Sequence, residues 1–237
     1  LHVIMCLDRA GLVGEDGPTH HGAFDLAYMR CIPNLTIASP YNEHYLRHLM
    51  YTAAYAADGP FVIRYPRGQG ELKDWENEMK IIEIGKGRKL KGGKDLAVLS
   101  IGPIGNAAAE AITKVEMMGY SVAHYDMIFL KPIDTDLLKE VAENYKHIMT
   151  IENGVVSGGL GSAVLEFLSE NNYNDKQVTR VGLPDEFVTH GAVKELTKLC
   201  KIDAEGLTTR MLEQLNLNDN SLKTADIPIA KEKIIQK

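Results

Sequence analysis

The strongest indication of the fold comes from VIMCL-DRAGLVGEDGPTHHG, residues 3–22. Its first five residues form a short apolar run that ends at a charged pair, which predicts a buried strand of an α/β sheet. The polar loop therefore begins at a strand end, where open α/β sheets bind their ligands. Because it combines a guanidinium, two carboxylates and two imidazoles between glycines that allow close backbone approach, residues 8–22 are the candidate ligand site.

The rest of the chain alternates between strand-like and helix-like segments. After the opening strand we expect helices at 23–30 and 41–54 and strands at 35–39 and 61–65. After a polar stretch at 68–80, the candidate linker, we expect strands at 95–101, 121–127, 147–152 and 178–182 and helices at 104–118, 134–144, 158–171, 192–200 and 204–215. Such alternation implies right-handed crossovers. The predicted fold is α/β, with two units at 1–80 and 81–217, each a mostly parallel sheet flanked by helices, and a polar, frayed tail at 218–237.

The composition excludes several classes of partner. The chain has 237 residues, 45% of them hydrophobic, and a formal net charge of -6 without a concentrated basic face, which argues against nucleic acid or a membrane surface. No run of 18 apolar residues predicts a membrane span. The three cysteines lack Cys-x-x-Cys spacing, which indicates reduced thiols in the cytoplasm. Because the first residues are already strand-like and no initiator Met precedes them, we expect the C-terminal part of a longer polypeptide.

The glycines of the loop do not form a known phosphate cradle. Gly11, Gly14 and Gly17 recur at every third residue, which fits neither the dinucleotide fingerprint nor the Walker pattern. Arg9 remains a candidate ligand for phosphate or carboxylate, since its planar fork makes bidentate, charge-assisted bonds. The alternative for Arg9 is a structural ion pair with Asp8 or Glu15.

The adjacent imidazoles of His20 and His21 point to opposite faces of an extended backbone, so at most one can face a ligand. A metal site that uses both is therefore disfavoured. One imidazole near Asp16 could relay protons at neutral pH. The alternatives are a packing histidine and, for Asp16 before a Gly-Pro pair, a simple turn residue.

A second pair of arginines, Arg64 and Arg67, lies at the end of the strand predicted at 61–65. Strand alternation and the intervening proline make Arg67 the ligand-facing member and Arg64 the structural one. Arg9 and Arg67 could then clamp a dianion jointly, and phosphate is the natural candidate.

A glycine-rich segment, GVVSGGLGS at residues 154–162, follows a strand and opens a helix, which suggests anion binding at a helix N-terminus. Its spacing does not fit the dinucleotide pattern, and no acidic residue is placed to bind a ribose. We therefore favour tight packing of helix on sheet.

Several motifs together resemble a known family. They are residues 8–20, GAFD at 22–25, RCIP at 30–33, DGP at 58–60, RYPRG at 64–68, FLKPID at 129–134, ENG at 152–154, GGLG at 158–161 and VGLPD at 181–185. The motifs resemble the 1-deoxy-D-xylulose 5-phosphate synthase family of the transketolase superfamily, over nearly the whole chain. The segment GEDGPTH is shared with transketolases, whereas DRAGLV and RYPRG select the synthases.

The resemblance implies a fold and a reaction. Residues 1–80 would be the C-terminal half of a transketolase-like pyrimidine-binding domain, and residues 81–217 a transketolase C-terminal domain. The family, a set of cytoplasmic homodimers, uses thiamine diphosphate and Mg²⁺ to condense pyruvate with D-glyceraldehyde 3-phosphate, releasing CO₂ in a step that serves isoprenoid and thiamine synthesis. The cofactor is the electron sink, and the protein orients the reactants.

Carried over to this sequence, the family's residues coincide with the loop. Arg9 and Arg67 would hold the acceptor phosphate, and Asp16 and His20 would face the reacting carbon. The residues that bind the cofactor and the metal would precede Leu1, so this fragment alone would be inactive. The alternatives are a transketolase or a 2-oxoacid dehydrogenase beta-type subunit with another acceptor, and a non-catalytic assembly module of the same fold.

Overall fold

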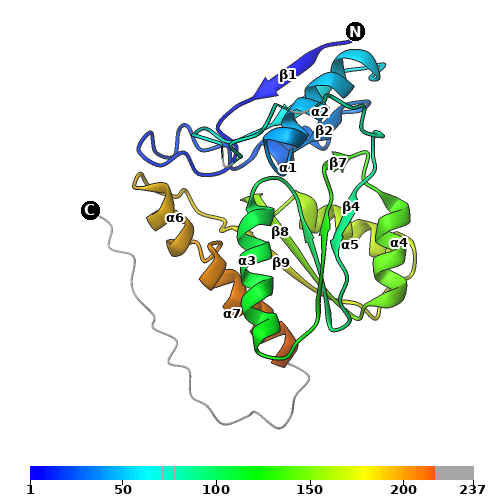
Figure 1. The fold of residues 1–237 in the computed structure, drawn as a ribbon, viewed down its shortest axis with the longest axis vertical. Coiled ribbons are helices and arrows are strands. Elements are labelled where there is room, and N and C mark those ends of the chain that lie inside the picture. Colours follow the sequence, from blue (N-terminus) through cyan, green and yellow to red (C-terminus); the bar gives the residue numbers. More distant parts are fainter. Residues whose placement is uncertain (71, 77, 217–237) are drawn as a thin grey trace.

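The structure is a computed structural model that describes residues 1–70, 72–76 and 78–216 (Figure 1). Strands and helices alternate along most of the chain, as the sequence predicts. In chain order the elements are β1 (Ile4–Leu7), α1 (Asp25–Met29), β2 (Thr36–Ala38), α2 (Glu43–Tyr55), β3 (Phe61–Arg64), β4 (Arg88–Lys91), β5 (Leu96–Ser100), α3 (Ile104–Met117), β6 (Val122–Asp126), β7 (Phe129–Lys131), α4 (Thr135–Asn144), β8 (His147–Val155), α5 (Leu160–Glu170), β9 (Gln177–Leu183), α6 (Val193–Leu199) and α7 (Ala204–Asn216).

The first sheet has the strand order β1-β3-β2-β7. Both β1 and β2 run parallel to β3, and the register places Leu7 of β1 opposite Arg64 of β3. The prediction of a buried first strand was wrong in part, because β1 is an edge strand and Val3 and Cys6 are exposed. Its carboxyl end nevertheless delivers the polar loop next to the end of β3.

The second sheet has the order β4-β6-β5-β8-β9 and is parallel except for β4. Figure 1 shows α3 and α7 on one side of this sheet and α4 and α5 on the other. Neighbouring residues of β5 belong to different cores: Val98 lies in the core that includes Ile112, whereas Leu99 lies in the core that includes Leu138. Burial on both faces explains why this strand reads as a continuous apolar run.

The ends of the helices follow ordinary capping chemistry. The Asp134 carboxylate accepts a hydrogen bond of 3.0 Å from the Leu137 amide at the start of α4. Gly119 follows α3 with a φ of 98° and donates to the Glu116 carbonyl at 2.9 Å, as expected for a glycine just beyond a helix.

Two short strands, β4 and β7, were not predicted from the sequence. Three of the four residues of β4 are basic, which suits an exposed edge strand but gives little apolar signal. The three-residue β7 belongs to the second half of the chain, yet it pairs antiparallel with β2 in the first sheet. Ile82 and Ile84 also pack against the core of the first sheet. The domain boundary at residue 80 therefore stays a prediction, and the expected tail at 218–237 lies outside the described residues.

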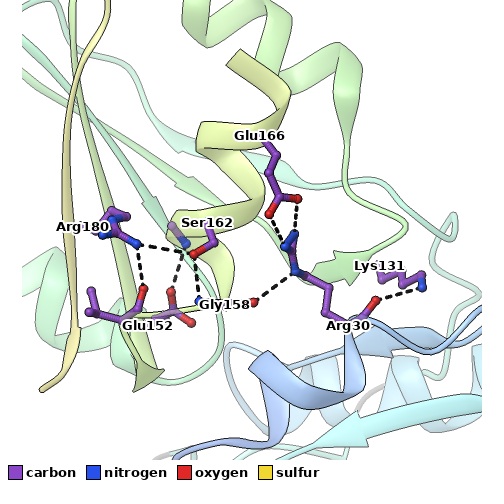
Figure 2. Close-up of polar contacts among 9 residues, drawn as sticks. Arg30, Lys131, Glu152, Gly158, Ser162, Glu166 and Arg180 are labelled. Carbon is purple, nitrogen blue, oxygen red and sulfur yellow. Dashed lines mark hydrogen bonds and ion pairs between the residues drawn. The ribbon is translucent and has the colours of Figure 1, made fainter. Parts of the chain in front are cut away.

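Further contacts fix the first unit on the second (Figure 2). Arg30, at the end of α1, donates to the Glu166 carboxylate of α5 at 2.8 and 2.5 Å and to the Gly158 carbonyl at 3.1 Å. The Lys131 ammonium of β7 donates to the carbonyls of Arg30 and Ile32 at 3.0 and 2.6 Å. The Arg30 contacts thus join the first unit to α5 beside the second sheet, and the Lys131 contacts hold β7 against the end of α1.

In the part of the chain that the structure describes, no helix has both the length and the apolar character needed to cross a membrane. The three cysteines are free.

Candidate functional site

The loop at residues 8–22 is closed at its base and turns twice. The Gly11 amide donates to the Gly22 carbonyl, and the Gly22 amide donates to the Arg9 carbonyl, both at 2.9 Å. Gly11, Gly14 and Gly17 all have positive φ values, of 75°, 81° and 74°. A Cβ on Gly14 would lie 2.8 Å from the Gly191 carbonyl oxygen. The regular glycine spacing therefore serves tight turns and contact with the second unit, rather than a phosphate cradle.

Arg9 has a strained backbone, since its φ of 65° lies in the left-handed region that favours glycine. Its guanidinium forms an ion pair with Asp8, which is one of the two partners that the sequence left open. The Arg9 Nε atom is buried and has no hydrogen-bond partner among the described residues. The Ala10 amide donates to the Tyr65 carbonyl at 3.0 Å, which holds Arg9 beside the end of β3.

Arg67 and Asp16 form an ion pair across the gap between the end of β3 and the loop. The Arg67 side chain is 55% exposed and that of Asp16 is 33% exposed. Within the described residues, no hydrogen bond or ion pair joins Arg9 or His20 to this pair. Ion pairs with this exposure contribute about 0–1 kcal/mol, so an anionic ligand can displace Asp16 from Arg67.

The two histidines have different environments, as their adjacency predicts. His20 is exposed, and its Nδ1 lies 3.0 Å from Thr19 Oγ1. The Nδ1 of His21 accepts a hydrogen bond of 3.1 Å from the Val13 amide, and its Nε2 lies 3.3 Å from the Thr189 carbonyl oxygen. His21 is therefore engaged on both ring nitrogens, whereas the ring of His20 remains open to solvent.

Arg64 is fully buried, which agrees with the structural role expected for it. Its guanidinium donates to the Asp25 carboxylate at 2.6 Å, the Asn153 side-chain oxygen at 2.5 Å and the Gly22 carbonyl at 2.7 Å. These bonds connect β3, α1, β8 and the end of the loop.

A hollow of about 330 Å³ lies beside Arg67, between the first turns of α2 and α3. Its walls include Tyr41, Leu46, Tyr65 and Asn106. Neither Tyr41 nor Asn106 was predicted from the sequence as a site residue. Both follow strands, β2 and β5, so the rule that ligands bind beyond the carboxyl ends of strands could have found them.

The glycine-rich turn before α5 is filled by the chain's own carboxylate (Figure 2). Glu152 is 1% exposed, and its Oε1 accepts a hydrogen bond of 3.0 Å from the Gly161 amide. Burial raises the pKa of this carboxyl, against the opposing effect of its backbone hydrogen bonds. A Cβ on Gly159 would lie 1.8 Å from Glu152 Oε2. Tight packing, the interpretation that the sequence favoured, therefore accounts for these glycines.

Among the described residues, no group of three or more His, Cys, Asp or Glu side chains is arranged to hold a metal ion.

The two-sheet fold and the loop at residues 8–22 agree with the protein family that the sequence matches. Residues 1–72 match the model of the transketolase pyrimidine binding domain, and residues 85–207 match that of the transketolase C-terminal domain. The chain belongs to the transketolase family.

Curated relatives of one name are similar to most of this chain. The chain is 63% identical over 208 residues to 1-deoxy-D-xylulose-5-phosphate synthase of Phocaeicola vulgatus, a match that covers 87% of this chain and 33% of that protein. It is 58% identical over 228 residues to the enzyme of the same name from Bacteroides thetaiotaomicron, covering 96% of this chain and 35% of the relative. The resemblance found in the sequence is confirmed, and the chain spans about a third of the length of these curated relatives.

Solved structures confirm the predicted α/β fold. A structure described as split gene transketolase, inactive beta4 tetramer, superposes with a TM-score of 0.77 and 32% identity, covering 91% of this chain and 67% of that chain. Transketolase from Campylobacter jejuni gives a TM-score of 0.65 with 17% identity, covering 89% of this chain and 31% of the other, and supports the fold alone.

Proposed function

We propose that this chain forms the C-terminal third of a 1-deoxy-D-xylulose 5-phosphate synthase, which condenses pyruvate with D-glyceraldehyde 3-phosphate and releases CO₂. The observation that carries the proposal is the identity of 63% to a synthase of that name over 87% of the chain. The identity to the split gene transketolase is 32%, so the synthase is favoured over the transketolase alternative.

In this proposal Arg9 and Arg67 bind the phosphate of the acceptor. They follow β1 and β3, which are neighbouring parallel strands, so both emerge at the same edge of the sheet. A guanidinium fork binds phosphate with two parallel, charge-assisted hydrogen bonds. The arriving dianion would displace Asp16 from Arg67, and the buried Arg9 Nε would gain a partner.

Asp16 and His20 are proposed to act at the reacting end of the acceptor. Both side chains are exposed on the loop that carries Arg9, so a ligand bound by its phosphate would lie along that loop. An imidazole can donate to the acceptor's oxygen and exchange a proton with it near neutral pH. A carboxylate such as Asp16, once released from Arg67, can accept a hydrogen bond from an acceptor hydroxyl.

The described residues do not fit the cofactor's diphosphate and metal. They contain no cluster that could hold an ion, and Glu152 fills the glycine-rich N-terminus of α5. We therefore propose that thiamine diphosphate and Mg²⁺ are bound mainly outside this chain, and that the chain by itself is inactive. The neighbour described as an inactive beta4 tetramer supports that proposal. A cytoplasmic homodimer remains the proposed state of the whole enzyme.

The test is product formation by the full-length enzyme that contains this chain. Given pyruvate and D-glyceraldehyde 3-phosphate, it should release CO₂ and 1-deoxy-D-xylulose 5-phosphate in equal amounts, identified by mass and NMR. A product that forms from ketose phosphate donors, and not from pyruvate, would identify a transketolase instead. No product with any donor would favour a non-catalytic module.

A further inference from the structure

We propose that His21 is a positioning residue, which holds the loop at residues 8–22 in its functional shape through a neutral imidazole protonated on Nε2. The activity measurements below rest on the proposed function, whereas the structural measurement does not.

The two hydrogen bonds of His21 define its tautomer. The Val13 amide can only donate, so His21 Nδ1 accepts through its lone pair and carries no proton. The Thr189 carbonyl can only accept, so Nε2 carries the proton. An imidazolium would direct an Nδ1 hydrogen at the Val13 N–H and lose that bond. Only the neutral Nε2–H form satisfies both neighbours.

The ring joins three parts of the site. Val13 lies between Arg9 and Asp16 in the loop, and His21 lies next to His20 near the end of the loop. Thr189 belongs to the segment that follows β9 in the second unit. The Gly191 amide of that segment also donates to the Gly14 carbonyl at 3.3 Å, so the loop is bound to the second unit at two points.

This arrangement separates the roles of the two adjacent histidines. Both nitrogens of His21 are used by backbone groups, so His21 is not free to exchange a proton with a ligand. Its bonds instead fix the backbone from which the exposed His20 ring projects. Losing them would let His20 and Asp16 move relative to the arginines, and misplacement by about 1 Å can lower a rate by about a hundredfold.

Glutamine provides a matched replacement, because its side-chain oxygen accepts and its NH₂ donates, as do Nδ1 and Nε2 of this tautomer. In the full-length enzyme we expect His21→Ala to lower kcat about 10- to 100-fold and to change the KM for pyruvate less than about threefold. His21→Gln should restore kcat to within about threefold of the wild type. His44→Ala is the control, since the His44 Nε2 lies 2.7 Å from the Asp74 carbonyl oxygen, away from the loop.

Amide hydrogen exchange of Val13 gives a readout without turnover. The Val13 amide should exchange faster in His21→Ala than in the wild type, and should regain its protection in His21→Gln. Unchanged Val13 exchange in His21→Ala would overturn the proposal. So would a His21→Gln enzyme as slow as His21→Ala, because imidazole chemistry would then be required. A wild-type enzyme that makes no product would contradict the proposed function alone, and Val13 exchange would still decide the role of His21.

Discussion

Arg64 on β3 donates a hydrogen bond of 2.5 Å to the side-chain oxygen of Asn153 on β8, so that one buried guanidinium connects the two sheets. The same side chain holds the Gly22 carbonyl at the end of the candidate loop. Arg67, three residues further on, is exposed and pairs with Asp16 on the loop itself. One strand end therefore carries one arginine that is fixed in the structure and one that can exchange its partner.

This contrast predicts a difference in stability between two matched variants. Arg64→Met should lower the free energy of unfolding by about 3–5 kcal/mol, because it leaves the buried Asp25 carboxylate without its cation. Arg67→Met should lower it by less than about 1 kcal/mol, since that pair is exposed. Urea denaturation of both variants measures the difference. Equal losses would show that burial of the Arg64 pair does not set its contribution.

Alanine substitutions at two glycines should also differ in their effect on the free energy of unfolding. Gly159→Ala would place a methyl group 1.8 Å from Glu152 Oε2, and the buried carboxylate would have to move. We expect a loss of about 1–3 kcal/mol or more, as for other overpacked cores. Gly92→Ala is the control, because the nearest described atom to its Cβ would be Lys89 Cε, at 3.9 Å, and it should change stability by about 0.5 kcal/mol or less. If both variants unfold at the same denaturant concentration, the packing of α5 on Glu152 is looser than described.

The buried His124 predicts a loss of stability in acid. Its Nε2 lies 2.8 Å from Ser100 Oγ, and burial, together with the charge of Arg88, lowers the pKa of the imidazole from 6.5 to about 4. Between these pH values the unfolded chain binds a proton that the folded chain does not, so stability falls as the pH falls. His124→Gln should flatten this decline in a urea-denaturation series.

A substitution at Asp126 should change the pH dependence of stability in the opposite direction to His124→Gln. Burial raises the pKa of its carboxyl from 3.8 to about 6, so the folded chain binds this proton more tightly and acid favours the folded state. Asp126→Asn should therefore steepen the decline in stability between pH 6 and pH 4. Parallel curves for the wild type and both variants would contradict these assignments.

His20→Ala tests the proposed chemical role of the exposed imidazole. If the ring exchanges a proton with the acceptor in the transition state, kcat of the full-length enzyme should fall by about 10²–10⁴-fold, with a smaller change in KM. Steady-state kinetics with each substrate varied in turn would measure this. An unchanged kcat would make His20 a structural residue.

Local patterns predicted much of the fold. The sequence predicted a strand at 95–101, and β5 (Leu96–Ser100) lies within it, with Val98 and Leu99 in two different cores. The adjacency of His20 and His21 predicted their different environments, and alternation along β3 separated Arg64 from Arg67. These inferences succeeded because each depends on the geometry of a few consecutive residues.

Local sequence patterns could not predict contacts between residues that are far apart in the chain. Nothing near Glu152 shows that its carboxylate fills the turn before α5, and nothing near Asp16 shows that Arg67 is its partner. The short β7 has only three residues, and its place in the first sheet depends on tertiary pairing with β2. The exposed face of β1 likewise depends on its edge position, which its apolar sequence does not reveal.

The assignment of Arg9 and Arg67 to the acceptor phosphate is tested by comparing two acceptors in the full-length enzyme and its Arg9→Ala and Arg67→Ala variants. For D-glyceraldehyde 3-phosphate, we expect each variant to lose about tenfold or more in kcat/KM, the equivalent of one charge-assisted contact. For unphosphorylated D-glyceraldehyde, and in the KM for pyruvate, the variants should stay within about threefold of the wild type, because neither offers a dianion to the guanidinium. Equal losses with both acceptors would contradict the assignment of Arg9 and Arg67 to the phosphate.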